Sequence, residues 1–301
     1  MTKITFCICT YDNHDSCKAL VNDFHSQKNV DFKLIVQDNT PYNLREYDSG
    51  CLEKTLKQNQ NFSYIKKETD GLSGSRNLCL DYADTEYVHF LDDDVRIDKY
   101  FVSNVINSLN SFNFPVALGS KVLPNWSNIE KPYWFKDEMY PLYSMLDFGP
   151  NFKIFRSPDS EISCWWLAGA NLCLNRKACI SLGGFNNSLG RKGGTHSLLS
   201  SEETELLINL SKKSDVFYCS QFPVLHDIKQ SRLSKSWLIK RCAWQSVSDI
   251  LTNDLWQSNS SHQEERVNLS IESLANRKNC DFSQLLGNIQ YLTYKILMGE
   301  I

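Results

Sequence analysis

The sequence predicts an α/β fold in which a mostly parallel central sheet carries helices on both faces. Apolar stretches of strand length alternate with stretches whose apolar residues recur at helical spacing through the first hundred residues. Polar clusters follow three of the expected strands, at residues 10–12, 38–39 and 92–94. Because parallel strands end at one edge of a sheet, these clusters should meet where such sheets bind their ligands.

The expected elements of the first hundred residues follow in a regular order. Strands are predicted at residues 4–10, 32–36, 62–65 and 87–91. Helices are predicted after Asp15, from Ser73 and over residues 101–112, since apolar side chains recur there every three or four positions. Asp15 and Ser73 are suitable N-caps for two of them. A polar stretch without a predicted element separates the second strand from the third.

The rest of the chain is less regular until it becomes helical. Short strands are predicted at residues 115–121, 164–174 and 215–221. Gly169-Ala170-Asn171 interrupts the second of these, and glycine in a strand often marks the close approach of a ligand or another backbone. From Ser231 onward two apolar stripes have helical spacing: Leu233, Trp237, Trp244, Val247 and Leu251, then Leu285, Ile289, Leu292 and Ile296. These helices could pack internally, form a homodimer or contact a membrane surface peripherally.

Composition narrows the class of protein. The formal net charge of −3 gives no electrostatic footprint for nucleic acid. No apolar run reaches the roughly 20 residues that span a bilayer, and the first residues enter a strand without the layout of a signal peptide. The eleven cysteines are scattered without C-x-x-C spacing, which indicates buried free thiols in a reducing compartment. We therefore expect a cytoplasmic protein without a transmembrane segment or a nucleic-acid partner.

The most informative motif is the acidic triplet Asp92-Asp93-Asp94 at the end of an apolar strand. Like charges this close repel one another, and a divalent cation removes that cost. Mg²⁺ and Mn²⁺ prefer carboxylate oxygens and often bind substrate phosphates as well. The triplet thus favours a metal site that holds a diphosphate. Its alternative is a solvated turn, in which Asp is also common.

Several motifs in order resemble those of glycosyltransferase family 2. They are Thr10-Tyr11-Asp12-Asn13, Asp38, Gly71-Leu72-Ser73-Gly74-Ser75-Arg76-Asn77, the acidic triplet, Gly169-Ala170-Asn171, Arg176, Gly183-Gly184-Phe185 and Ser201-Glu202-Glu203-Thr204-Glu205-Leu206. The resemblance covers roughly residues 3 to 245. It implies a GT-A fold and an inverting, metal-dependent transfer of a sugar from a nucleotide-sugar, expected to be a UDP-sugar, to an acceptor hydroxyl.

The resemblance also divides the chain. Residues 1–112 would form the nucleotide-sugar-binding half of the GT-A domain, residues 113–230 its acceptor-binding and catalytic half, and residues 231–301 a C-terminal helical extension. The acceptor would be a glycan or a lipid-linked glycan, although a protein acceptor is also open.

The metal ligands implied by the resemblance are Asp94, Asp92 and His226, which would hold Mn²⁺ or Mg²⁺. Residues i and i+2 of an extended backbone face the same way, so Asp92 and Asp94 can address one ion while Asp93 points away. Asp92 and Asp93 are also expected among the nucleotide-sugar contacts. His226 follows a strand-like stretch, where a histidine completes the metal shell in several GT-A enzymes; its alternative is a structural role.

The remaining donor contacts are expected from the first half of the chain and from one glycine-rich loop. Asp38 would accept a hydrogen bond from the base, and its alternative is a turn aspartate. Thr10, Tyr11 and Asp12 would line the base pocket, Tyr11 by stacking unless it is an ordinary core residue. Arg76 would reach a phosphate or the base, and the helix opened by Ser73 would favour the diphosphate. Lys192, Arg191 and Arg232 could neutralise the diphosphate or be surface charges.

Glu203 is the general base that the resemblance implies. Such a carboxylate must reach the acceptor hydroxyl that it deprotonates. Two alternatives stand beside it: Ser200-x-x-Glu203 is also a capping box, and the adjacent Glu202 could be the base instead. On the acceptor side we expect Trp165, Trp166 and Asn171, with one tryptophan in the core and the other stacked on a sugar ring.

Two other functions fit parts of the sequence. A sugar-phosphate nucleotidyltransferase also pairs such a sheet with acidic metal ligands, but it should carry a glycine-rich basic loop after the first strand, where this chain has Thr10-Tyr11-Asp12-Asn13-His14. A non-catalytic nucleotide-sugar-binding relative is the other alternative, and the intact acidic triplet argues against it.

Overall fold

The structure is a computed structural model of the 301-residue chain. It describes residues 4–28, 30–44, 49–127, 129–155, 167–195 and 197–252, together with Ile289 and Thr293. Within these residues, no helix combines the length and the apolar character needed to cross a membrane. The nine cysteines among them are all free thiols, in agreement with the sequence.

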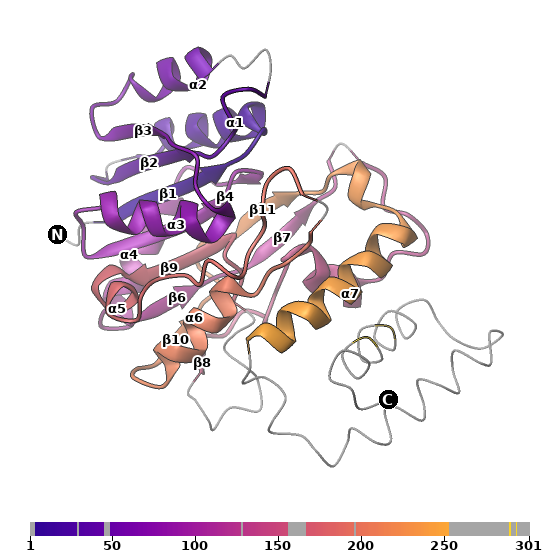
Figure 1. The fold of residues 1–301 in the computed structure, drawn as a ribbon. Coiled ribbons are helices and arrows are strands. Elements are labelled where there is room, and N and C mark those ends of the chain that lie inside the picture. The colour runs from indigo at the N-terminus through magenta and orange to yellow at the C-terminus, as the bar shows by residue number, and fades with distance from the viewer. Residues whose placement is uncertain are drawn as a thin grey trace, which may run out of the picture.

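An eight-stranded sheet forms the centre of the molecule (Figure 1), in the order β3-β2-β1-β4-β9-β6-β10-β8. Its strands are β1 (Ile4–Thr10), β2 (Lys33–Asp38), β3 (Phe62–Lys66), β4 (Tyr87–Asp92), β6 (Ala117–Gly119), β8 (Lys153–Phe155), β9 (Asn171–Asn175) and β10 (Val216–Tyr218). Only β9 and β8 are antiparallel to the other strands. Strand β9 pairs in antiparallel fashion with β4 and β6, and β8 does so with β10. The predicted mostly parallel sheet is confirmed.

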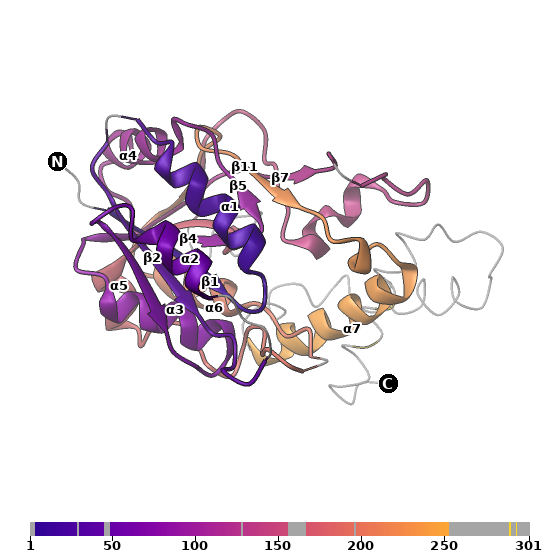
Figure 2. The same ribbon diagram turned by 90° about the horizontal axis from the view of Figure 1, so that it is seen from above.

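Helices cover both faces of this sheet because its strands are apolar on both sides. The helices are α1 (His14–His25), α2 (Ser49–Leu56), α3 (Gly71–Tyr82), α4 (Phe101–Ser111), α5 (Arg176–Ser181), α6 (Glu202–Ser211) and α7 (Lys235–Leu251). Along β1, Phe6 and Ile8 point into the core cluster under α1, α2 and α4, whereas Cys7 points into the cluster under α3, α5 and α6. Figure 2 shows α1 and α4 on one side of the sheet and α3 and α6 on the other.

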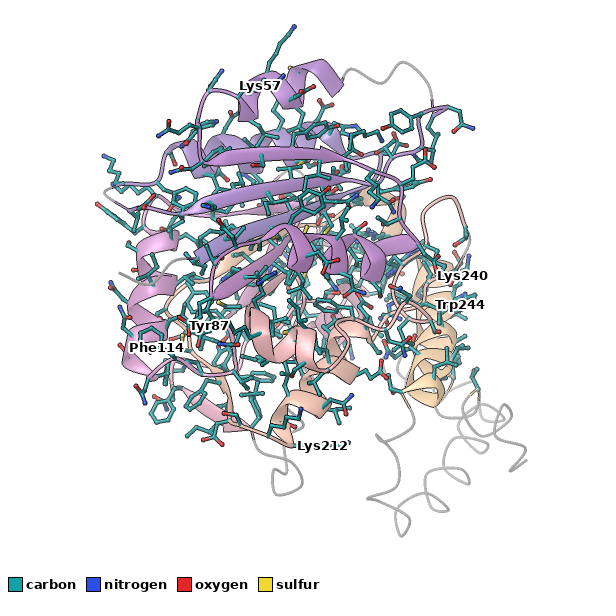
Figure 3. The ribbon with its side chains drawn as sticks, turned by 60° about the vertical axis from the view of Figure 1, so that its left-hand side comes forward. Lys57, Tyr87, Phe114, Lys212, Lys240 and Trp244 are labelled. Carbon is teal, nitrogen blue, oxygen red and sulfur yellow. The ribbon has the colours of Figure 1, made fainter. Side chains whose placement is uncertain are left out.

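The first cluster is dense in aromatic side chains. The ring of Phe6 lies 5.1 Å from that of Phe24 and 5.1 Å from the imidazole of His89. At the rim of the sheet, Tyr87 and Phe114 lie side by side (Figure 3), with ring centroids 6.3 Å apart. Burial of this much apolar surface is the main stabilising contribution to the sheet.

A second, three-stranded sheet carries one of the expected metal ligands. It consists of β5 (Val95–Arg96), β11 (Val224–Asp227) and β7 (Val122–Asn125), with β11 in the middle. Strand β5 begins directly after the acidic triplet, and His226 on β11 pairs with Val95. The backbone N–H of Asp227 also donates to the carbonyl of Asp94 over 2.8 Å. The small sheet therefore brings β11 to the end of β4.

Several predicted boundaries differ from the structure. Strand β9 spans Asn171–Asn175, and residues 164–166 of the predicted strand lie outside the described part. The predicted N-cap role of Ser73 is wrong, because α3 begins at Gly71 and the Ser73 hydroxyl donates to the carbonyl of Leu189 over 2.8 Å. Asp15 lies in the first turn of α1 and is not its cap. The polar stretch before β3 contains α2.

Helix α7 buries a different face from the predicted stripe. Leu238 and Cys242 are buried, but so are the polar residues Arg241, Ser246 and Ser248. Of the stripe, Trp237 packs on Tyr143 with ring centroids 5.0 Å apart, whereas Leu251 is 47% exposed. The labelled Lys240 and Trp244 follow along this helix in Figure 3. The second predicted stripe lies outside the described residues except for Ile289.

Candidate active site

Two aspartates and one histidine converge at the carboxyl end of β4. His226 Nε2 lies 3.4 Å from Asp94 Oδ1 and 3.9 Å from Asp92 Oδ2. One ligand atom from each of the three residues lies within 4.8 Å of the others. Asp94 and His226 are buried, whereas the Asp92 side chain keeps 29% of its surface exposed. The cluster is therefore open to a ligand on one side.

This donor set fits a divalent cation. Carboxylate oxygens and an imidazole nitrogen suit Mn²⁺, and carboxylates suit Mg²⁺. Burial alone would lower the pKa of His226, but Asp94 and Asp92 outweigh it and raise the pKa. Likewise, burial would raise the pKa of Asp92, but the contacts with His226 and Arg76 hold it below its usual value. One imidazole and one guanidinium thus offset part of the negative charge of these carboxylates.

Asp93 lies with Asp94 in the turn between β4 and β5, and its side chain points to β1 and the start of α1 instead of to His226. Its two carboxylate oxygens accept from the Thr10 hydroxyl over 2.6 Å and from Asn13 Nδ2 over 2.7 Å. Burial, together with the nearby charge of Asp94, raises the pKa of Asp93 to about 7. Both Thr10 and Asp93 were expected to contact the nucleotide. In the structure they bind each other and tie the end of β1 to the triplet.

Asp38 lies at the end of β2 in a fully buried polar pocket. Its carboxylate accepts from the Thr40 backbone N–H over 2.8 Å and from the Tyr64 hydroxyl over 2.6 Å. His14 Nε2 and Lys66 Nζ lie 3.2 and 3.5 Å from it. The side chain is 0% exposed. Contact between Asp38 and a nucleotide base therefore requires one of these partners to be replaced.

The loop between α5 and α6 covers Tyr11. A Cβ placed on Gly193 would lie 2.0 Å from the Tyr11 ring, so the backbone of this loop rests directly on the aromatic face. Next to it, Lys192 Nζ pairs with Asp70 at 2.9 Å, ahead of the first turn of α3. Asp12 is exposed, has φ of 51°, and donates its backbone N–H to Thr40. Stacking of a base on Tyr11 would thus displace the loop that carries Lys192.

Arg76 has a role that the sequence did not predict. Its guanidinium donates to Glu202 Oε1 over 2.6 Å and to Asp92 Oδ1 over 3.4 Å. The residue is 3% exposed, and its guanidinium lies 5.5 Å from the ring of Phe185. Burial would lower the pKa of Arg76, but Glu202, Glu203 and Asp92 outweigh it and raise the pKa. In the structure Arg76 joins Asp92 to α6, and its contact with the nucleotide stays a prediction.

Glu202 and Glu203 begin α6 beside this arginine. Burial, reinforced by Glu203 and opposed by Arg76, raises the pKa of Glu202 to about 7. Glu203 Oε1 accepts from the Gly169 backbone N–H over 3.4 Å, and its Oε2 is buried without a protein partner. The capping-box alternative is wrong, because the N-cap is Ser201 and makes no side-chain capping bond. Glu203 therefore keeps one oxygen for another proton donor.

The polar face of α7 fixes the segment before these two glutamates. Arg241 donates to the Ser200 hydroxyl over 3.1 Å, and Gln245 Nε2 donates to the Ser201 hydroxyl over 3.1 Å. Ser201 has φ of 73°, a left-handed conformation that is costly for a residue with a side chain. The contacts with α7 hold this strained turn, and with it the start of α6. The predicted apolar stripe gave no sign of this polar face.

Arg191 lies within electrostatic range of two other arginines, Arg232 and Arg241, and of Glu202 and Asp92. Burial, with the nearby charges of Arg241 and Arg232, lowers the pKa of Arg191 to about 10, against the opposing charges of Glu202 and Asp92. The carbonyl of Arg191 accepts from the Leu72 N–H over 2.8 Å, which fixes its backbone at the start of α3. Guanidinium groups this close repel one another, and a shared anion would relieve that cost.

Of the expected acceptor residues, the structure describes Asn171 alone. Asn171 is 0% exposed; it donates to the carbonyls of Lys121 and Phe222, and its amide oxygen pairs with His89 Nε2 at 2.9 Å. Its polar atoms join β9 to the two sheets, and the acceptor contact of Asn171 stays a prediction. Trp165 and Trp166 lie outside the described residues.

Four residues of the site were not singled out from the sequence. Asn13 holds Asp93, His14 contacts Asp38, and Lys229 Nζ lies 3.7 Å from Asp94 Oδ2. Gly169 is the fourth, because a Cβ there would lie 2.4 Å from the Arg76 guanidinium. Only Gly169 had a signal, as a glycine inside an apolar strand. Asn13 and Lys229 are ordinary polar residues just before helices and His14 is the first residue of α1, and only folding brings them to the site.

The model of the family described as Glycosyl transferase family 2 matches residues 5–162. The glucosyl-dolichyl phosphate glucuronosyltransferase of Haloferax volcanii is 23% identical over 255 residues, which cover 82% of this chain and 76% of the relative. The succinoglycan biosynthesis protein ExoM of Rhizobium meliloti is 22% identical over 251 residues, 78% of this chain and 70% of the relative.

Two solved structures share the fold. The mannosyltransferase PcManGT from Pyrobaculum calidifontis, in complex with GDP-Man and Mn²⁺, has a TM-score of 0.55 at 12% identity and covers 97% of this chain and 69% of its own. S. aureus TarS 1–349, in complex with UDP-GlcNAc, has a TM-score of 0.54 at 13% identity. The match covers 99% of this chain and 92% of the TarS chain. These likenesses confirm the GT-A fold that the sequence predicts.

Proposed function

Because the chain belongs to glycosyltransferase family 2, we propose that it transfers a sugar from a UDP-sugar to an acceptor hydroxyl with inversion and with a divalent cation. It is a glycosyltransferase enzyme; the donor, the metal and the stereochemistry are the proposal. The observation that carries it is the convergence of Asp92, Asp94 and His226 beside the pair Glu202–Glu203. A metal site and a carboxylate base are what a single displacement on an activated sugar needs.

The donor would lie across the carboxyl ends of β1, β2 and β4. Asp92, Asp94 and His226 would hold Mn²⁺ or Mg²⁺, which would offset the charge of the diphosphate. Tyr11 offers an aromatic face for the base, and the Asp38 pocket suits a base N–H group. The names of the neighbouring structures, with GDP-Man and Mn²⁺ in one and UDP-GlcNAc in another, support a nucleotide-sugar with a divalent cation.

Glu203 would act as the general base. The acceptor oxygen attacks the anomeric carbon, its proton passes to Glu203 Oε2, and the bond from that carbon to the diphosphate oxygen breaks. A nucleoside diphosphate leaves, and the configuration inverts because there is one displacement. Oε2 of Glu203 suits this step because it has no donor among the described residues. Oε2 of Glu202 has none either, but the other oxygen of Glu202 is paired with the Arg76 guanidinium, and Glu203 has no such ion pair among the residues described. Arg191 and Arg232 would stabilise the charge on the leaving diphosphate.

The names of two relatives support a proposal for the class of acceptor. One is a glucosyl-dolichyl phosphate glucuronosyltransferase and the other a succinoglycan biosynthesis protein, so a lipid-linked glycan or a polysaccharide precursor is the acceptor class we propose. In this proposal residues 1–112 bind the donor and residues 113–230 bind the acceptor. The enzyme would then work at the inner face of a membrane, at its surface.

The test is a pair of variants with separate readouts. Asp94→Ala should abolish the rise in melting temperature that a UDP-sugar causes with Mn²⁺, because ligand binding stabilises by mass action. Glu203→Gln should keep that rise and reduce turnover by about 10³-fold or more, as loss of a general base and its charge requires. Glu205→Gln, two residues further along α6, is the matched control and should change neither. Near wild-type turnover in Glu203→Gln would contradict the base assignment.

A further inference from the structure

A cavity lies beyond the carboxyl ends of β7 and β11 in the small sheet. Its volume is 440 Å³, and it is lined by Glu130, Lys131, Pro132, Tyr133 and Gln230. Its lining comes from the segment after β7 and from the first residue of a 3-10 helix, Gln230–Arg232. A cavity of this size can hold about one small ligand ring with its substituents.

The topology brings the two segments that line the cavity together at one edge of the small sheet. Strands β7 and β11 run parallel with His226 beside Pro124, so both chains leave the sheet at the same edge. Asn125 Nδ2 donates to Asp227 Oδ1 over 2.6 Å and joins the two strand ends. Lys229 reaches within 3.7 Å of Asp94, and the next residue, Gln230, lines the cavity. The residue that lines the cavity on this side therefore follows directly in the chain on one that contacts Asp94.

Contacts of Lys131 hold one wall of the cavity in place, whereas the ring of Tyr133 on the same wall is exposed. Lys131 Nζ pairs with Asp137 at 2.7 Å and lies 5.6 Å from the ring of Phe135, which fixes the segment to the aromatic packing beneath. Tyr133 is 97% exposed. An almost fully exposed tyrosine beside a cavity is a ready contact surface, because its ring is rigid, apolar on its face and polar at its end.

We propose that this cavity binds one uncharged sugar ring of the acceptor, with Tyr133 stacked on the ring and Gln230 hydrogen-bonded to its hydroxyls. The inference rests on the proposed function and assigns a place to its acceptor. A sugar ring presents apolar C–H faces and polar hydroxyls, so it needs an aromatic face together with amide and charged groups. Glu130 and Lys131 have opposite charges, so the lining carries no net charge that would select a phosphate.

The experiment uses the full chain and an array of neutral oligosaccharides without any nucleotide. The wild type should bind glycans on the array, and Tyr133→Ala should weaken that binding at least about 10-fold. Tyr133→Trp should retain the binding, because stacking on the sugar ring needs only an aromatic face. Gln230→Ala should weaken it also. Tyr82→Ala is the control, since Tyr82 is 59% exposed at the far end of α3 and should not change binding.

A second readout separates this inference from the proposed function. Release of UDP from a UDP-sugar without acceptor should be unchanged in Tyr133→Ala and absent in Asp94→Ala, and Asp94→Ala should still bind glycans. Equal glycan binding by Tyr133→Ala and wild type, or no glycan binding by the wild type, would overturn the inference. So would a loss in Tyr133→Ala that appears only with anionic phospholipid vesicles. Absence of any nucleotide release from the wild type would instead contradict the proposed function.

Discussion

The substitution Arg76→Met tests the link between the metal cluster and α6. It removes the guanidinium that bonds Glu202 over 2.6 Å and Asp92 over 3.4 Å, and it leaves Glu202, which is 3% exposed, as a buried carboxylate. Breaking a buried ion pair from one side costs about 3–5 kcal/mol. For a chain of this size each kcal/mol lowers the melting temperature by about 2–4 °C, so a fall of roughly 6–20 °C is expected.

The penalty should depend on pH in a direction set by Glu202. The pKa of Glu202 is already raised to about 7, and without Arg76 it rises further. A carboxyl whose pKa is raised by folding contributes stability at low pH that is lost as pH rises through the folded pKa. The free energies of unfolding of Arg76→Met and wild type should therefore be closest near pH 5 and diverge above pH 7.

Denaturant unfolding at several pH values measures both effects. Arg96→Met is the matched control, because Arg96 also pairs with a carboxylate at 2.6 Å but keeps 43% of its side chain exposed, where such pairs contribute at most about 1 kcal/mol. The double variant Arg76→Met/Glu202→Gln should be more stable than Arg76→Met alone. The role assigned to Arg76 is wrong if Arg76→Met lowers the free energy of unfolding less than Arg96→Met does. It is also wrong if the loss of free energy in Arg76→Met does not vary with pH.

Three further predictions concern other parts of the site and core. His89 is buried, and burial lowers its pKa to about 3. The free energy of unfolding should therefore fall by about 1.4 kcal/mol per pH unit below pH 6.5, and His89→Gln should flatten that slope in acid unfolding curves. Gly169→Ala puts a Cβ 2.4 Å from the Arg76 guanidinium and should cost about 1–3 kcal/mol in thermal unfolding with a loss of turnover; an unchanged protein would contradict the packing described. Gly193→Ala should push the loop off Tyr11 and lower the Kd for UDP by up to about 10-fold in calorimetry; weaker binding would show that the loop and the base do not compete.

Local patterns were sufficient for the first four strands of the central sheet. Strand β1 is apolar throughout and was predicted at its observed bounds, Ile4–Thr10, because a strand buried on both faces is a continuous apolar run. The Asp-x-Asp pair was predicted to share one face, and the structure brings Asp92 and Asp94 to the same histidine. These features depend on residues close together in the sequence.

Other features depend on partners far along the chain. Arg76 looked like a phosphate ligand because its partner Glu202 lies 126 residues away. Asn171 looked like an acceptor ligand in a glycine-rich motif, yet it bonds the carbonyls of Lys121 and Phe222. The small sheet was missed because its strands are short and gain their stability from pairing with one another, which no local pattern encodes.

The central claim is that Asp92, Asp94 and His226 bind a divalent cation together with the diphosphate of the donor. A crystal structure with UDP and Mn²⁺, with anomalous data at the manganese edge, tests it directly. The account predicts an anomalous peak bonded to Asp94 and His226 and to the diphosphate, with Glu203 facing the space where the sugar would lie. A manganese peak and a nucleotide that both lie elsewhere would contradict it.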